Sequence, residues 1–225
     1  MKFNIPSSKK NKDYIIQQIG LQASPKINEI VLKKVRPIVK ELFIETLKDN
    51  PVYKGLIGEY PNSKEWDIQA HFGLTDQEVQ LFITQFDEIL QTYTKVNRSR
   101  QRVLGIDVIF ADHQKIIDNI GSAGRYTSKN GYDIPWLQWL LAGAGEVESA
   151  IFFHSDGRDF GVESKSGRAI MIETNDKFPE SWSVGNYSFG QRKNFVDGTF
   201  NNIQFRNKVS ALIANTYNEV IKGYK

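Results

Sequence analysis

Apolar residues recur at steps of three and four positions in three stretches of the chain, which is the spacing of one face of an α-helix. The first stretch covers residues 25–43 and contains Pro37, which predicts a kink or two helices that meet near Arg36. The second covers residues 76–92, and a capping box, Thr75-Asp76-Gln77-Glu78, marks its start. The third covers residues 202–222. These patterns predict a helical N-terminal part and a C-terminal helix.

Residues 132–173 are the densest apolar stretch, and they predict a buried helix followed by short strands. Asp133 and Pro135 mark the helix start, because proline lacks only an N–H that the first turn leaves unpaired. Gly143 and Gly145 are expected to end the helix. Strands are then expected at 149–154, 160–164 and 169–173, with a turn at 164–167, and alternation predicts another strand at 104–110. The fold class is therefore α+β, with a small antiparallel sheet and packed helices.

Three segments divide the chain in this interpretation. Residues 1–24 form a basic N-terminal arm, residues 25–93 a helical part, and residues 103–225 a mixed α/β part that continues the same domain. Between them, TKVNRSRQR (residues 94–102) is polar and basic, and it can contact phosphates or serve as a solvated linker. The linker is favoured because no aromatic residue is interleaved to stack on bases. Residues 174–200 lack clear periodicity, which is typical of a segment that orders against a neighbouring subunit.

Composition excludes several kinds of site and adds a charge pattern. The chain of 225 residues has no cysteine, which excludes disulfides and thiolate metal ligands. No apolar run approaches the roughly 18–20 residues that span a bilayer. Residues 1–40 carry nine Lys and Arg against two acidic residues, a net charge of +7, which leaves −4 for the rest of a chain whose total is +3. Such an arm can contact nucleic acid, a membrane surface or an acidic protein, or can simply be solvated.

Glu163 and Lys165 are the candidate catalytic residues. With Asp156 and Asp159 upstream, they resemble the metal-dependent nuclease pattern called PD-(D/E)xK, in which carboxylates hold magnesium and the lysine positions a water. Asp159 lies only four residues before Glu163, whereas that pattern takes its aspartate from a preceding strand, so the spacing opposes the interpretation. The three histidines are isolated and lack the spacing of metal ligands. We therefore expect no catalytic residue, no metal and no cofactor, with the nuclease as the alternative.

Aromatic side chains supply the candidate subunit interface. Trp136 and Trp139 lie three positions apart on one predicted helix face, and such a pair either packs in a core or anchors a partner. A stand-alone binding module that uses this pair is a further alternative. Four more interface candidates come from the irregular segment: Trp182, Tyr187, Phe189 and Phe195.

Three short segments occur in a distinctive order along the chain. They are HFGLTD (residues 71–76), PWLQWLL (residues 135–141) and SKSGRAIM (residues 164–171), and a Trp-x-Val element follows at residues 182–184. Over roughly residues 72–184, this order resembles a family of structural proteins from the virions of large tailed bacteriophages, myovirus-like ones especially. The chain departs from the family pattern at Lys165, where the family usually has arginine, and at residues 185–187, where it often has a proline and small residues.

The resemblance implies a virion component at the neck, either a head–tail connector or a tail completion or terminator subunit, without enzyme chemistry. The implied partners are neighbouring neck, portal or tail subunits and further copies of the chain in a homo-oligomeric ring. Non-specific proximity to DNA is implied if DNA passes through that ring, and no membrane is involved. The implied location is the virion, after assembly in the host cytoplasm.

Overall fold

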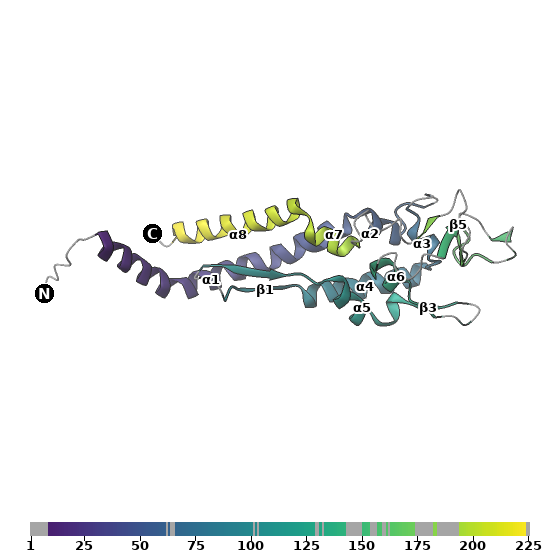
Figure 1. Cartoon of the computed structure of the whole chain (residues 1–225), viewed down its shortest axis with the longest axis horizontal. Coiled ribbons are helices and arrows are strands. Elements are labelled where there is room, and N and C mark those ends of the chain that lie inside the picture. Colours follow the sequence, from purple (N-terminus) through teal and green to yellow (C-terminus); the bar gives the residue numbers. More distant parts are fainter. Residues whose placement is uncertain are drawn as a thin grey trace. The chain divides into compact units, whose positions relative to one another are not determined.

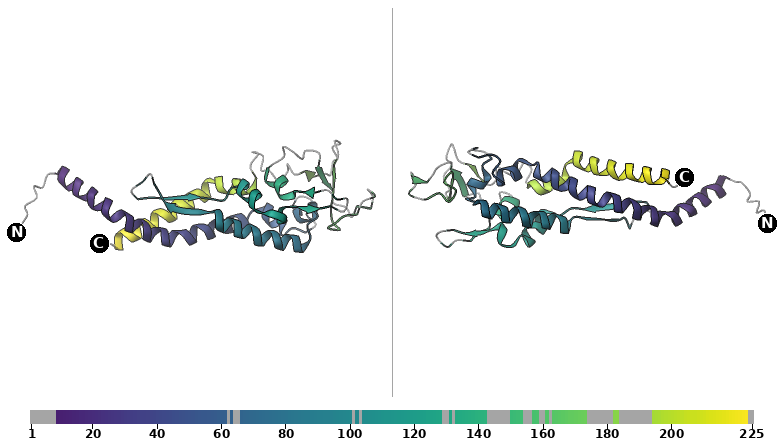
Figure 2. Two further views of the ribbon diagram at one scale, coloured as in Figure 1. Left: turned by 90° about the horizontal axis from the view of Figure 1, so that it is seen from below. Right: turned by 180° about the vertical axis from the view of Figure 1, so that it is seen from behind.

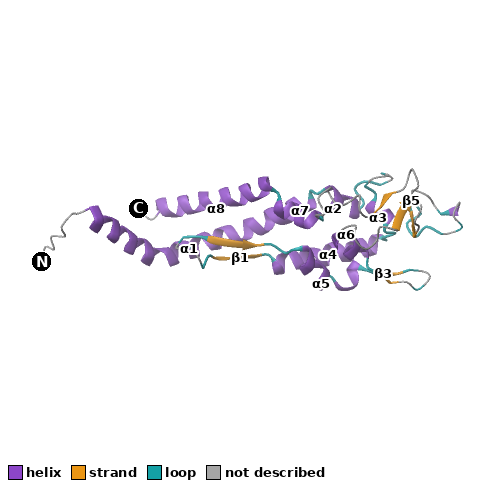
Figure 3. Ribbon diagram, viewed as in Figure 1, coloured by secondary structure: helices purple, strands orange, loops and turns teal. Residues whose placement is uncertain are grey.

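The structure, a computed structural model, divides the chain into two compact units (Figure 1). Unit 1 comprises residues 1–39, 95–109 and 207–225, and unit 2 comprises residues 40–94 and 110–206. Helices and three small antiparallel sheets make up the described part, which confirms the predicted α+β class (Figure 3). The structure describes residues 9–61, 63, 66–100, 102, 104–128, 131, 133–142, 150–153, 157–158, 161, 163–173, 182–183 and 194–223.

Helix α1 (Lys9–Lys48) is one continuous helix that begins within the segment 1–24 predicted as a basic arm. Of the two alternatives predicted for Pro37, a kink or two helices that meet near Arg36, the second is not formed. Pro25 and Pro37 lie inside α1, each removing one backbone donor. Packing offsets this loss, because a row of fully buried side chains recurs every four residues, at Val31, Val35, Val39, Phe43 and Leu47.

Unit 1 contains a β-hairpin where the sequence predicted a linker. Strand β1 (Lys95–Arg98) pairs antiparallel with β2 (Ile106–Ile109), and the register places Val96 opposite Val108. The hairpin lies along α1, where the Arg36 guanidinium donates hydrogen bonds of 3.2 and 3.3 Å to the Val96 carbonyl (Figure 2). The linker prediction was wrong because β1 has a single buried side chain, Val96, and so shows no alternation of apolar residues.

The C-terminal helix α8 (Ile203–Gly223) confirms the prediction for residues 202–222, and its end from residue 207 belongs to unit 1. Asn28 connects the parts of this unit. Its side-chain oxygen accepts hydrogen bonds from the Tyr217 hydroxyl on α8 and, at 3.2 Å, from the Gly105 amide in the hairpin. Asn28 is 1% exposed, so these bonds satisfy a buried polar group.

The structure confirms the predicted capping box at the start of helix α4 (Asp76–Tyr93). Thr75 and Glu78 form the capping box of α4, since the Thr75 hydroxyl accepts from the Glu78 amide and the Glu78 carboxylate accepts from the Thr75 amide. The Asp112 side chain caps helix α5 (His113–Asn119) by accepting a hydrogen bond from the Lys115 amide. The helical segments of unit 2 are α2 (Pro51–Leu56), α3 (Ile68–His71), α4 (Asp76–Tyr93), α5 (His113–Asn119), the 3-10 helix η1 (Gly121–Gly124), α6 (Trp136–Ala142) and α7 (Phe195–Asn201).

Two small sheets accompany these helices. One pairs β3 (Tyr126–Thr127) with β4 (Asp133–Ile134), and the other has the order β6 (Ile170–Glu173), β5 (Ala150–Phe153), β7 (Trp182–Ser183), all antiparallel. Strands β5 and β6 match two of the three strands expected here. The expected strand at 160–164 is not formed at its described residues, where Gly161 has φ +64° and β5 pairs directly with β6.

The core of unit 2 is aromatic. The Phe82 ring lies 5.0 Å from the Phe86 ring and 5.4 Å from the Trp136 ring, and Phe72 lies 5.9 Å from Trp136 (centroid distances). Tyr53 packs on Phe82 and Phe86. Burying side chains of this size supplies most of the stabilisation of such a core. None of the described helices combines the length and apolar character needed to cross a bilayer.

Candidate functional site

The three segments that carry the resemblance meet at one place in unit 2. The Phe72 ring packs on the Trp136 ring at 5.9 Å, which joins the first segment to the second. A Cβ built on Gly73, in the first segment, lies 3.3 Å from the Lys165 Cβ in the third. The Ser166 hydroxyl also donates a 3.1 Å hydrogen bond to the carbonyl of Ala70, the residue directly before the first segment. Segments nearly a hundred residues apart in sequence therefore form one site, called here the convergence site.

A bidentate ion pair between Asp67 and Arg168 lies at the base of the convergence site. Arg168 Nε donates to Asp67 Oδ2 at 2.9 Å, and Arg168 Nη2 donates to Asp67 Oδ1 at 3.2 Å. The same carboxylate caps α3 by accepting from the Ala70 amide at 3.2 Å. Asp67 has no exposed surface, whereas the Arg168 side chain is 34% exposed. The hydrogen bond with Asp67 raises the pKa of Arg168, so the guanidinium stays charged.

A second ion pair joins the turn at residues 164–167 to helix α4. Lys165 Nζ donates to both Glu78 oxygens, at 2.7 and 2.9 Å, and lies 3.8 Å from the centre of the Tyr126 ring. Burial raises the pKa of Tyr126 to about 12, with a smaller contribution from the Glu78 charge. Burial also raises the pKa of Glu78, but hydrogen bonds from Lys165 and Thr75 outweigh it, so this pKa lies below its ordinary value.

The lowered pKa of Glu78 predicts a loss of stability in acid. Near the ordinary value of 4.5 the unfolded chain binds more protons than the folded one, so the stabilisation is present above that pH and declines as pH falls through the lower, folded value. In Glu78→Gln, which keeps a capping residue, this contribution is absent at every pH. We expect the difference in urea midpoint between wild type and variant to shrink between about pH 7 and about pH 3. A difference that stays constant contradicts the assignment.

Gly73 permits the close approach of the turn. It follows α3 with φ +62°, as expected of a helix-ending glycine, and a Cβ built there lies 3.3 Å from the Lys165 Cβ. We expect Gly73→Ala to destabilise unit 2 by about 1–2 kcal/mol, because the left-handed backbone is strained for alanine and Lys165 must move. Urea unfolding followed by tryptophan fluorescence measures this, since all four tryptophans belong to unit 2.

Gly167 provides the matched control for that substitution. It has a similar φ of +71°, but a Cβ there meets nothing within 4 Å. Gly167→Ala therefore carries the backbone strain without the contact, and we expect it to cost less than Gly73→Ala. An equal cost for the two variants would show that the approach of Lys165 contributes nothing.

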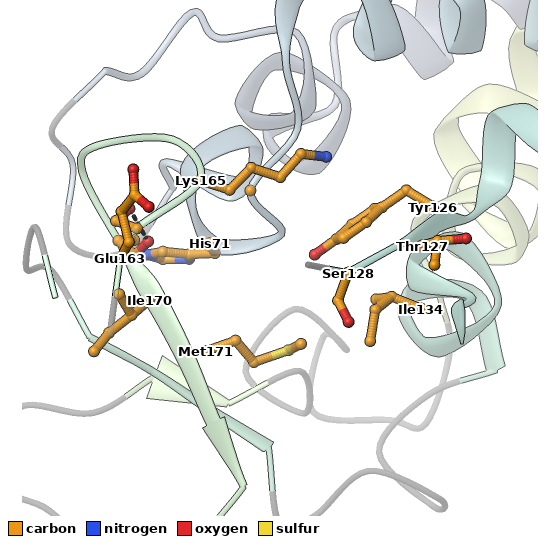
Figure 4. Close-up of a pocket in the computed structure, with 12 residues that line it drawn as sticks. His71, Tyr126, Thr127, Ser128, Ile134, Glu163, Lys165, Ile170 and Met171 are labelled. Carbon is orange, nitrogen blue, oxygen red and sulfur yellow. Dashed lines mark hydrogen bonds between the residues drawn. The ribbon is translucent and has the colours of Figure 1, made fainter. Parts of the chain in front are cut away.

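A pocket of about 320 Å³ opens beside these contacts. Figure 4 shows its two walls: the β3–β4 side contributes Tyr126, Thr127, Ser128 and Ile134, and the opposite side contributes His71, Glu163, Lys165, Ile170 and Met171. Apolar and hydroxyl-bearing side chains predominate in this lining. His71 is 2% exposed, and Lys165 is held by Glu78.

The structure does not assemble the nuclease site within the residues it describes. The Lys165 ammonium, which that interpretation assigns to a water molecule, donates to Glu78 instead. Glu163 is exposed beside the pocket, while Asp156 and Asp159 lie outside the described residues. No group of three or more histidine, aspartate or glutamate side chains suited to a metal occurs in the described part. His71 and His113 lie on different helices, and His154 is not described.

The six predicted interface residues differ in exposure, and two of them lie outside the described residues. Trp136 and Phe195 are each 1% exposed and belong to the core, so neither side chain offers surface to a partner while this fold persists. Trp139, one turn after Trp136, is partly exposed. Trp182 contributes its backbone to β7, and Tyr187 and Phe189 lie outside the described residues. Core packing, the other interpretation of Trp136, therefore accounts for its position.

Sequence reasoning missed both ion pairs of the convergence site. Asp67 and Arg168 are 101 residues apart, and Glu78 and Lys165 are 87 apart, so no local spacing reveals them. The capping role of Glu78 was predicted, but its second role was not. The only signal was the position of Asp67 before a short helix and of Arg168 after a glycine turn.

Comparisons of the chain with protein-family models, with curated proteins and with solved structures each found no match.

Proposed function

We propose that the chain is a structural subunit of a tailed-phage virion, at the neck, where it forms a head–tail connector or a tail completion or terminator ring. The observation that carries this proposal is the convergence site. The segments that resemble the virion family are far apart in sequence, yet the fold brings parts of them together. Phe72 packs on Trp136, and a Cβ built on Gly73 lies 3.3 Å from the Lys165 Cβ.

The chemistry of the site also suits a structural role. Two of its cationic side chains are held in ion pairs that bridge elements, Arg168 by Asp67 and Lys165 by Glu78. Such pairs fix the position of a turn against a helix, and a subunit of a mechanical assembly needs that rigidity. A catalytic lysine instead needs its amine directed at a substrate or a water.

Imaging of intact virions at a resolution that shows side chains tests the proposal. The sequence Trp136-Leu137-Gln138-Trp139 is a recognisable marker, because two indoles lie three positions apart on helix α6. We expect density for it in a closed ring at the neck, which also gives the ring symmetry and the neighbouring proteins. Absence of the chain from the particle overturns the proposal, and a magnesium-dependent cleavage assay with a Glu163→Ala control then tests the nuclease alternative.

A further inference from the structure

The two units carry opposite net charges. Unit 1 contains fifteen Lys and Arg against four Asp and Glu, a net charge of +11, whereas unit 2 contains fourteen against twenty-two, a net charge of −8. Together these give the +3 of the chain. This difference in charge is not visible along the sequence, because unit 1 combines the two ends of the chain with the central hairpin.

The positive charge of unit 1 is exposed. Ten of its cationic side chains are described as exposed, against three acidic ones, and none of the ten forms an ion pair with another described residue. Four of the ten lie in or beside the β1–β2 hairpin: Lys95, Arg98, Arg100 and Arg102. Exposed cations that form no ion pair attract an anionic surface.

The hairpin also exposes aliphatic side chains, and this combination with cations favours a protein partner. Leu104 is 40% exposed and Ile109 is 59% exposed, and the register places Ile109 directly opposite the exposed Lys95. Two more exposed aliphatic side chains of unit 1 are Ile38 and Ile221. Nucleic-acid interfaces are more polar than this, and single strands are bound by exposed aromatics, which the described side chains of unit 1 lack.

Unit 2 supplies the complementary surface. Glu41 and Glu45 are exposed one turn apart on α1. Glu88 is exposed on α4, two turns after Leu81 on the same helix face, and Leu81 is 42% exposed. These three glutamates form no ion pair with a described residue. Every copy of the chain therefore presents two surfaces whose charged residues form no ion pair with a described residue. One is cationic and the other is acidic, and each also exposes aliphatic side chains.

We propose that copies of this chain associate head-to-tail, with the cationic hairpin of unit 1 in one copy docking on the acidic surface of unit 2 in a second copy. Two different surfaces that dock on each other generate a ring when the rotation closes. The inference rests on the proposed function only for the expectation of a ring; the charges and exposed side chains carry the contact itself. Opposite potentials also guide the encounter and reject the contact of like units.

Two charge-reversed variants of the full chain test this contact. The first replaces Arg98, Arg100 and Arg102 by glutamate, and the second replaces Glu41, Glu45 and Glu88 by lysine. Wild type is expected to self-associate in sedimentation velocity, less strongly at about 1 M salt, where the Debye length is about 3 Å. Each variant alone is expected to associate at least roughly 100-fold more weakly, because it brings like charges together.

The mixture of the two variants is the decisive sample. It pairs the acidic hairpin of the first variant with the basic unit 2 of the second, and the native cations of the second with the native acids of the first. We expect association to return in the mixture and to require both variants. Restored association also shows that both variants are folded, so misfolding cannot explain the loss in each one alone.

Three outcomes overturn the inference: a wild type that stays monomeric at every salt and protein concentration tested, a first variant that associates as wild type does, and a mixture without restored association. Binding of wild type but not of the first variant to duplex DNA, without self-association, assigns the hairpin to nucleic acid instead. The proposed function fails separately, through absence from the virion. If the chain is found at the neck but its assembly does not depend on these charges, the proposed function stands and the head-to-tail contact is overturned.

Discussion

Replacing Arg168 by alanine is expected to destabilise unit 2 by about 3–5 kcal/mol, the cost of leaving a buried charge without its partner. Asp67 has no exposed surface, and Arg168 supplies two of its hydrogen bonds. Urea unfolding followed by tryptophan fluorescence measures the effect. A cost of about 1 kcal/mol or less, as for an exposed ion pair, would contradict the importance of the buried carboxylate.

A double-mutant cycle separates the ion pair from the other roles of its members. Asp67→Asn removes the charge and keeps a good helix cap for α3, since asparagine caps as well as aspartate does. We expect the double variant with Arg168→Ala to be less destabilised than the sum of the two single variants, because no uncompensated charge is left. Additive costs would show that the two side chains contribute independently.

Truncating Trp136 to alanine is expected to cost about 3–5 kcal/mol, as for other large aromatic side chains removed from a core. The indole is 1% exposed and packs against both Phe72 and Phe82. Its loss removes the contact between two segments of the convergence site and leaves a cavity. Circular dichroism with urea measures the change without depending on the fluorophore that is removed.

Trp139→Ala is the matched control, since it removes the same side chain from the same helix at a partly exposed position. We expect a clearly smaller loss of stability there. Similar costs for the two variants would contradict the assignment of Trp136 to the core.

The sequence predicted the elements whose signals are local. The capping box at Thr75 and Glu78 and the apolar spacing of residues 202–222 each identified a helix that the structure contains. A cap and an amphipathic row act within a few residues, so they can be read without the rest of the fold.

Short elements stabilised by distant contacts were missed. Helix α2, which Asn50 caps and in which Pro51 occupies the first turn, was not predicted. Helix α7 begins at Phe195, after the Asn194 cap, inside a stretch that appeared irregular. Helices of six or seven residues are too short to show a periodic pattern, and their stability comes from burial of side chains such as Phe195.

The convergence site and the opposite charges of the two units could not be predicted from short stretches of sequence, because both depend on which distant parts of the chain come together. The basic stretch at residues 94–102 appeared to be a linker because β1 itself has only one buried side chain; its partner, β2, falls within the strand predicted at 104–110, but no local signal in β1 indicated that the two would pair. Net charge summed along the sequence gave a basic arm and an acidic remainder. The sum over each unit differs, because the fold returns the C-terminal end of the chain to unit 1.

This discontinuity sets an order of events during synthesis. When residue 206 has left the ribosome, every residue of unit 2 is present, but the part of α8 that completes unit 1 is still to come. Domains fold as units while the chain emerges. The acidic unit can therefore fold first, and unit 1 is completed only once residues 207–225 have emerged.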